Sequence, residues 1–108
     1  MAGPRMTTSV LKVVAALLAE AGTERYGLQL MHDTGLPSGT LYPILVRLER
    51  AGWVASRWEE VDPAAEGQPT RRYYQLTGEG AVEARREVAL MRRQMSRATG
   101  PTGHTREA

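Results

Sequence analysis

Hydrophobic residues recur at the period of an α-helix in the first third of the chain, in two stretches that each lead to a glycine. Residues 7–21 carry valines and leucines at this spacing, and the threonines and serine at their start offer N-caps. Residues 24–34 predict a shorter second helix in which Leu28 and Met31, with Leu30 beside them, face inward. The pattern therefore indicates two packed helices before residue 35.

Residues 37–52 form the most informative stretch, because apolar and polar residues separate onto opposite sides of one helix. The apolar stripe has the spacing i, i+3, i+4 and i+7 and consists of Leu41, Ile44, Leu45 and Leu48. Ser38 is the expected N-cap, and Pro43 stands near enough to the first turn to be tolerated. Taken alone, the stretch is either an ordinary amphipathic surface helix or one that offers Arg47 and the polar side to a DNA major groove.

The second half of the chain predicts a hairpin and a last helix. Residues 53–61 and 71–76 alternate between two faces as strands do, and Pro, Gly and small polar residues separate them. Residues 78–97 form a helix whose small and apolar residues recur at spacings of 3, 4, 3 and 4. This heptad seam consists of Ala81, Ala84, Val88, Met91 and Met95. Either the chain's own first helix or a second copy of the chain packs on it, and we expect some of both.

The order of these elements predicts an α+β fold that is mainly α with a small β-hairpin: a winged helix-turn-helix with a C-terminal dimerisation helix. The expected division is a flexible tail over residues 1–6, a DNA-binding domain over 7–76, the dimerisation helix over 77–97 and a disordered tail over 98–108. A chain of 108 residues buries only a modest core, so dimerisation would add apolar contact.

Composition narrows the function classes. The chain has no cysteine, which excludes disulfides and thiolate metal sites, and no apolar run reaches the roughly 20 residues that span a bilayer. No phosphate-cradling loop, nucleophile elbow or metal-ligand cluster is present, so we expect no enzyme, no metal, no cofactor and no membrane contact. We expect a cytoplasmic protein.

Positive charge gathers where the polar side of the third helix and the hairpin fall. The net charge is only +2, but residues 37–58 carry three arginines against Glu49, and residues 71–108 carry eight arginines against four glutamates. Residues 59–70 hold four acids and no base, so an acidic loop separates two basic segments. This distribution favours a nucleic-acid contact on both sides of the loop.

The stretch SGTLYPILVRLERAGWV, followed by RRYYQLTGEG and preceded by YGLQL, resembles the PadR family of transcriptional regulators. The resemblance covers roughly residues 10–97 and indicates the short subfamily with one C-terminal helix. It implies a winged-helix homodimer, built through the first and last helices, that binds a palindromic operator and usually represses. Some short members bind flat aromatic drugs between tryptophans of the paired last helices, whereas residues 78–97 contain no Trp, Tyr or His.

Double-stranded DNA is the expected partner, and two groups of residues are expected to contact it. Ser38, Gly39 and Thr40 lie at the positively polarised start of the third helix, where free N–H groups bind phosphate. The next candidates along this helix are Tyr42, Pro43 and Arg47. Tyr42 could instead pack on the second helix, and Arg47 could be a solvated surface residue; whether Arg50 reaches DNA stays open. At the wing, Arg71 and Arg72 are candidates, one at the DNA and the other paired with Glu59 or Glu60.

Dimerisation is assigned to residues of the first and last helices: Val10, Val14, Leu17, Ala84, Val88, Met91 and Met95. The interface between two copies could bind a small apolar effector, which the sequence does not identify. The alternative function is a winged-helix module that acts through protein–protein contacts rather than DNA. The arginines of the third helix and the hairpin favour DNA.

Overall fold

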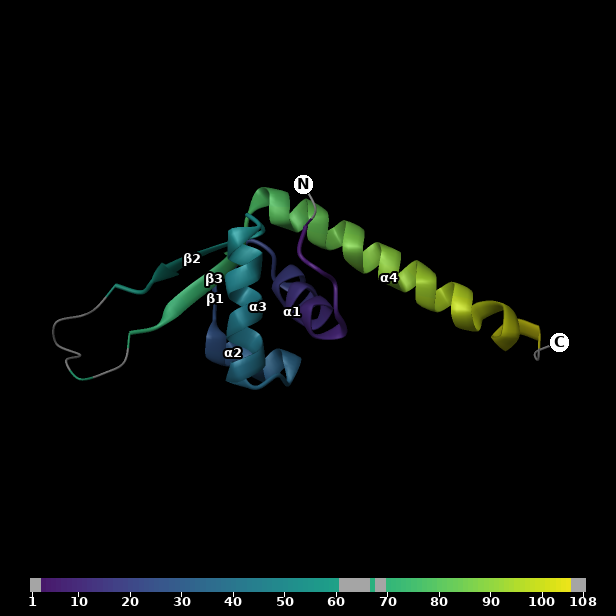
Figure 1. The fold of residues 1–108 in the computed structure, drawn as a ribbon, viewed down its shortest axis with the longest axis horizontal. Coiled ribbons are helices and arrows are strands. Elements are labelled where there is room, and N and C mark those ends of the chain that lie inside the picture. The colour runs from purple at the N-terminus through teal and green to yellow at the C-terminus, as the bar shows by residue number, and fades with distance from the viewer. Residues whose placement is uncertain (1–2, 61–66, 68–69, 106–108) are drawn as a thin grey trace.

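The computed structural model describes residues 3–60, 67 and 70–105, and this part of the chain forms four helices and a three-stranded antiparallel sheet (Figure 1). The elements in chain order are α1 (Thr8–Ala19), β1 (Arg25–Tyr26), α2 (Gly27–Thr34), α3 (Ser38–Arg50), β2 (Val54–Trp58), β3 (Arg72–Leu76) and α4 (Gly78–Thr105). The predicted winged helix-turn-helix fold is confirmed. Figure 1 shows the β2–β3 hairpin and α4 extending to opposite ends, with α1, α2 and α3 between them.

The core lies where α1, α2 and α3 meet the base of the hairpin and the start of α4. The apolar stripe of α3 is between 0 and 2% exposed, as the helical period predicts. Most of the remaining core comes from α1 and the sheet, and includes Val10, Val13, Val14, Leu17, Leu30, Trp53, Val54, Tyr74 and Leu76. Leu28, which we expected to face inward, is 71% exposed, so that expectation was wrong; Leu30 is the buried leucine of α2.

The hairpin pairs β2 with β3 antiparallel, in a register that the alternation alone did not predict. Val54 pairs with Leu76, Ser56 with Tyr74, and β2 ends where Trp58 pairs with Arg72. Val54, Tyr74 and Leu76 therefore lie on one face of the sheet, where they are buried against the helices. Most of the connecting loop, residues 61–66 and 68–69, lies outside the described residues.

A third strand, β1, replaces the first turn of the helix that we expected over residues 24–34. Arg25 pairs with Tyr74 and Tyr26 with Tyr73, giving the sheet order β1-β3-β2. Two residues are too few to show alternation, so only the contact with β3 decides their extended conformation. Helix α2 then begins at Gly27, where the backbone N–H of Tyr26 donates to the Gln29 side chain at 3.0 Å.

Two helix termini follow the expected chemistry and one does not. The Thr7 hydroxyl accepts the Val10 N–H at 3.2 Å and caps α1, and Gly35 ends α2 in the left-handed conformation with φ 73°. The N-cap of α3 is Pro37 rather than Ser38, which is the first helical residue, so the predicted serine cap was wrong.

Helix α4 packs on α1 near its start and then continues beyond the other helices (Figure 1). It ends at Thr105, not near Arg97, so the helix includes most of the stretch in which we expected a disordered tail. Among the described residues, no helix is long and apolar enough to cross a membrane.

Candidate nucleic-acid interface

Helix α3 presents a solvent-exposed surface opposite its buried stripe. Ser38, Gly39, Pro43 and Arg47 are exposed, Thr40 is half-buried, and these residues lie on the side of α3 that faces solvent. The structure thus brings together all the α3 residues that the sequence singled out, including Tyr42, which is 38% exposed.

The N-terminal end of α3 can accept an anion through its backbone. The Pro37 carbonyl accepts the N–H groups of Thr40 and Leu41 at 3.0 and 2.9 Å. The N–H groups of the first two helical residues, Ser38 and Gly39, have no acceptor one turn earlier within the helix. No atom lies within 4 Å of the place where a β-carbon on Gly39 would stand, so a ligand can approach this backbone closely.

Tyr42 packs on α2, which is one of the two interpretations that the sequence left open. Its hydroxyl end lies against Gly27, so closely that a β-carbon on Gly27 would overlap it. Part of the ring nevertheless remains exposed. The absence of a side chain at Gly27 therefore sets where the Tyr42 ring lies on the surface between α2 and α3.

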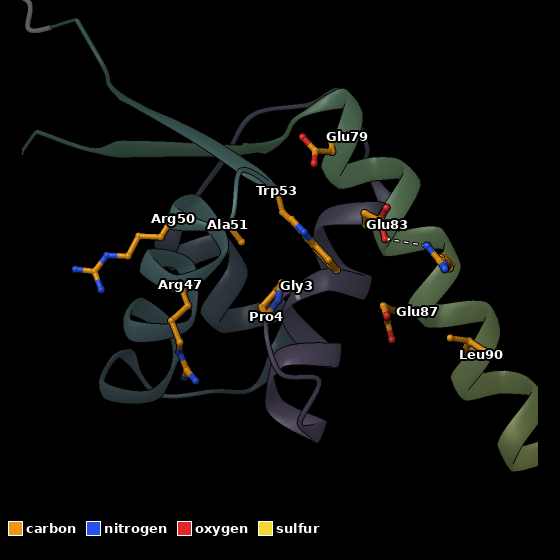
Figure 2. A pocket seen from close by; sticks show the side chains of 11 residues that line it. Gly3, Pro4, Arg47, Arg50, Ala51, Trp53, Glu79, Glu83, Glu87 and Leu90 are labelled. Carbon is orange, nitrogen blue, oxygen red and sulfur yellow. Dashed lines mark ion pairs between the residues drawn. The ribbon is translucent and has the colours of Figure 1, made fainter. Parts of the chain in front are cut away.

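The arginines of α3 project from its second half. Arg47 Nε donates to the Pro43 carbonyl at 3.5 Å, a long contact that leaves the guanidinium at the surface. Figure 2 shows Arg50 pointing away from α4. Both arginines line one wall of a cavity of about 780 Å³, and the α4 wall carries the acidic side chains Glu79, Glu83 and Glu87.

The two wing arginines contact aromatic and polar side chains of the protein itself. The Arg71 guanidinium donates to the Tyr26 hydroxyl at 2.9 Å and lies over the Tyr26 ring, while its backbone N–H donates to the Glu59 carboxylate. Arg72 donates to the Ser56 hydroxyl at 2.7 Å and lies 3.9 Å from the Glu49 carboxylate. Across the hairpin, Arg71 therefore contacts Glu59 through its backbone N–H, while its guanidinium contacts Tyr26.

Glu49 connects α3 to the wing, a role that the sequence pattern does not indicate. Its carboxylate accepts a hydrogen bond of 2.7 Å from the Ser56 hydroxyl on β2, and Ser56 in turn accepts one from Arg72 on β3. Three polar side chains from three elements therefore fix the position of the hairpin relative to α3. Glu49 and Ser56 lie seven residues apart on different element types, so no periodicity would have paired them.

A second missed contact braces the outer side of the sheet. Arg57 on β2 donates to both carboxylate oxygens of Glu24, at 2.5 and 2.7 Å, and lies over the Tyr73 ring. This hydrogen bonding lowers the pKa of Glu24 below its usual value and raises the pKa of Arg57. Arg57 is thus engaged by the protein itself, although it belongs to the basic segment.

Arg25 connects the C-terminal ends of α1 and α2. It is 6% exposed, forms a short ion pair with Asp33 near the end of α2, and also lies 3.6 Å from Glu20 after α1. Hydrogen bonds from Arg25 lower the pKa of Asp33. The buried cation is therefore compensated by carboxylates from two sides.

The predicted dimerisation residues divide into two groups. Val10, Val14, Leu17 and Ala84 are at most 2% exposed within one chain, so the chain's own side chains already cover them. Val88 is 7% exposed, Met91 is half-buried and Met95 is 60% exposed. The available apolar surface thus increases toward the part of α4 that leaves the body.

The short helix α2, a tight turn and the exposed helix α3 form a helix-turn-helix, and the β2–β3 hairpin packs beside it as a wing. This arrangement defines a winged helix-turn-helix protein of the DNA-binding class. The model of the PadR-like transcriptional regulator family matches residues 14–86, and the chain belongs to this family. Proteins of this family regulate transcription by binding DNA and are not enzymes.

Solved structures agree with this assignment. A PadR-like transcription factor from Bacteroides fragilis is 21% identical with a TM-score of 0.69, over 86% of this chain and 88% of that one. A PadR family regulator from Eggerthella lenta is 29% identical with a TM-score of 0.57, over 88% and 82%. The PcaV regulator from Streptomyces coelicolor, solved with its natural ligand, is 27% identical with a TM-score of 0.67, over 89% and 62%. No curated protein matches the sequence.

Proposed function

We propose that this protein is a cytoplasmic, sequence-specific transcriptional repressor that binds a palindromic operator as a homodimer. Helix α3 enters the major groove, and the β2–β3 wing contacts the adjacent backbone or minor groove. The observation that carries this proposal is the division of α3: its apolar stripe is 0 to 2% exposed, while its predicted DNA contacts reach the surface together.

Each contact has a distinct chemical role. The N–H groups of Ser38 and Gly39 bind a phosphate, and the Thr40 hydroxyl assists them. Pro43 offers apolar surface to a base edge, and Arg47 binds a guanine or a phosphate. Arg71 is the wing residue that we assign to DNA, because its side chain is exposed and contacts Tyr26 groups at the surface, whereas Arg72 is half-buried and lies 3.9 Å from the Glu49 carboxylate.

Dimerisation through α4 follows from its shape and surface. The helix extends beyond the body, and the molecule measures 66 × 31 × 24 Å. Leu90, Met91 and Met95 lie on this extended part, where Leu90 and Met95 are 38 and 60% exposed. Pairing two such helices about a two-fold axis covers this surface and places two α3 helices on a palindromic site.

A small apolar effector between the paired helices is also part of the proposal. The related PcaV structure contains its natural ligand, and the NadR structure, 22% identical, contains 4-hydroxyphenylacetate. These structures support ligand sensing by proteins of similar fold, and the ligand of this chain has to be found by screening.

Selection from a random pool of DNA duplexes tests the proposal most directly. We expect enrichment of one palindromic sequence, bound by a dimer. Affinity should fall steeply with added salt, with a slope of about −0.9 per phosphate contacted. Failure to enrich any sequence, together with weak binding that ignores salt, would favour the module that acts through protein–protein contacts.

A further inference from the structure

A groove of about 690 Å³ lies between the start of α2, the Tyr42 side of α3, and the ends of β2 and β3 nearest the loop. Its walls are mainly aromatic and are formed by Tyr26, Tyr42, Trp58 and Tyr74. At its rim, the Trp58 side chain is 58% exposed and the Leu28 side chain 71% exposed. Tyr74 is a core residue that is 6% exposed, so the accessible ring surface of the groove comes mainly from Trp58 and Tyr42.

Two guanidinium groups stand among these rings, and both are held in position. Arg72 lies 4.8 Å from the centre of the Trp58 ring, donates to Ser56 and lies 3.9 Å from the Glu49 carboxylate, which is outside the lining. Arg71 lies 4.7 Å from the centre of the Tyr26 ring and donates to the Tyr26 hydroxyl. Among the described residues, the lining contains these two cations and no acidic side chain. An occupant should therefore combine a planar ring with negative charge.

We propose that this groove binds a nucleotide, with its base against the aromatic walls and its phosphate at the two arginines. A phosphate monoester carries a charge of about −1.5 to −2 at neutral pH and has three strong acceptor oxygens. These oxygens can satisfy two guanidinium groups, whereas one carboxylate is satisfied bidentately by a single arginine. The volume falls within the roughly 300–1,000 Å³ of small-molecule sites, and it exceeds the space that one aromatic ring needs.

A nucleotide in this position would act on DNA binding. The groove shares Tyr42 and Arg71 with the proposed DNA surface, so this consequence rests on the proposed function. With α3 in the major groove and the wing on the neighbouring backbone, a DNA strand has to pass over the groove. Nucleotide and duplex therefore compete, and a rising nucleotide concentration releases the operator.

Isothermal titration calorimetry on the full chain tests the binding site without DNA. The probes are GMP and AMP, compared with guanosine and adenosine, inorganic phosphate, and 2-naphthoate. We expect one nucleotide to bind at least tenfold more tightly than its nucleoside, than phosphate and than the aromatic carboxylate. L28E adds a negative charge at the exposed rim and should weaken this binding at least tenfold, while the thermal midpoint stays the same. V82E makes a similar change at the exposed Val82 of α4 and should leave nucleotide binding unchanged.

Three results would overturn the site: no heat from either nucleotide at millimolar concentration, equal or tighter binding of 2-naphthoate, or equal weakening by L28E and V82E. The second measurement titrates the nucleotide into a complex with a selected duplex and follows fluorescence anisotropy. Release of the duplex supports the shared surface, and a ternary complex overturns it. A protein that binds the nucleotide but no DNA would refute the proposed function and leave the nucleotide site in place.

Discussion

The Glu49 carboxylate on α3 accepts a 2.7 Å hydrogen bond from the Ser56 hydroxyl on β2, and this bond ties the recognition helix to the wing. The Ser56 oxygen also accepts a hydrogen bond from Arg72, so its donor and acceptor capacities are both used. A helix and a hairpin that must reach neighbouring grooves need a fixed relative position, and this contact supplies it.

Replacing Glu49 by Ala should therefore loosen the wing. We expect operator affinity to fall about tenfold, which corresponds to ~1.4 kcal/mol, with only a small change in thermal midpoint. Glu49→Gln keeps a carbonyl oxygen that can accept from Ser56 and should restore most of the affinity. Fluorescence anisotropy with a selected duplex measures both, and native affinity of the alanine variant would refute the role.

At both Gly27 and Gly80, another part of the chain packs so closely against the glycine that a β-carbon would overlap it. A β-carbon at Gly27 would overlap the hydroxyl end of Tyr42, whereas one at Gly80 would overlap the Trp53 backbone carbonyl. A side-chain end can rotate away, but the backbone cannot. We expect Gly27→Ala to keep its thermal midpoint and lose DNA affinity, and Gly80→Ala to be destabilised by about 1–3 kcal/mol or more. Equal destabilisation of the two variants in thermal unfolding would contradict this account.

Arg47 should contribute base preference as well as affinity. Arg47→Ala is expected to cost roughly 1–3 kcal/mol in discrimination at one base pair, because Arg47 follows Pro43 by one turn on the exposed side of α3. Arg50→Ala, measured on the same panel, tests whether Arg50 at the end of α3 also reaches a base pair. Binding to a panel of single-base operator variants measures the effect. An unchanged panel profile for the Arg47 variant would remove this residue from the site.

Met91 should lie in the interface between two copies of α4. Met91→Glu places a charge in that seam and should shift the protein from dimer to monomer. Val82→Glu introduces the same side chain at an exposed residue of α4 that is outside the seam, and should leave the dimer intact. Analytical ultracentrifugation measures both. A Met91 variant that sediments as a native dimer would place the interface elsewhere.

Stability should decrease in acid because two carboxylates are stabilised by arginines in the folded state. Arg57 lowers the pKa of Glu24 from its ordinary 4.5, and Arg25 lowers the pKa of Asp33 from its ordinary 3.8. As pH falls, the unfolded chain therefore binds protons at these two carboxylates before the folded chain does. Their contribution to the free energy of unfolding is complete above the ordinary pKa values, and it is lost as pH falls through the lower pKa values of the folded protein. Urea unfolding between pH 7 and 3 should show this loss. Glu24→Gln and Arg57→Gln should each reduce the pH dependence of the free energy of unfolding on the acid side. If both variants keep the wild-type slope, the Glu24–Arg57 ion pair does not cause the loss of stability.

The helices and the hairpin were accessible from the sequence because their determinants are local. The stripe of α3 is buried as its spacing predicts, and the same spacing leaves Ser38, Gly39, Pro43 and Arg47 on the exposed side. The alternation of residues 54–58 and 72–76 likewise predicts which side chains of each strand share a face, whereas the register between the strands comes from their pairing. Which residues share a face of a helix or strand depends on neighbours a few positions away, but which face is buried depends on packing, as the exposed Leu28 of α2 shows.

Tertiary structure alone decided the contacts between distant segments. The strand of Arg25 and Tyr26 exists because β3 lies beside it, and its two residues carry no periodic signal. The engagement of Arg72 by Ser56 and Glu49, and of Arg57 by Glu24, depends on how α3, β2 and β3 come together in space. Local pattern predicted which residues reach the surface, whereas packing determined which of those charges remain available for DNA.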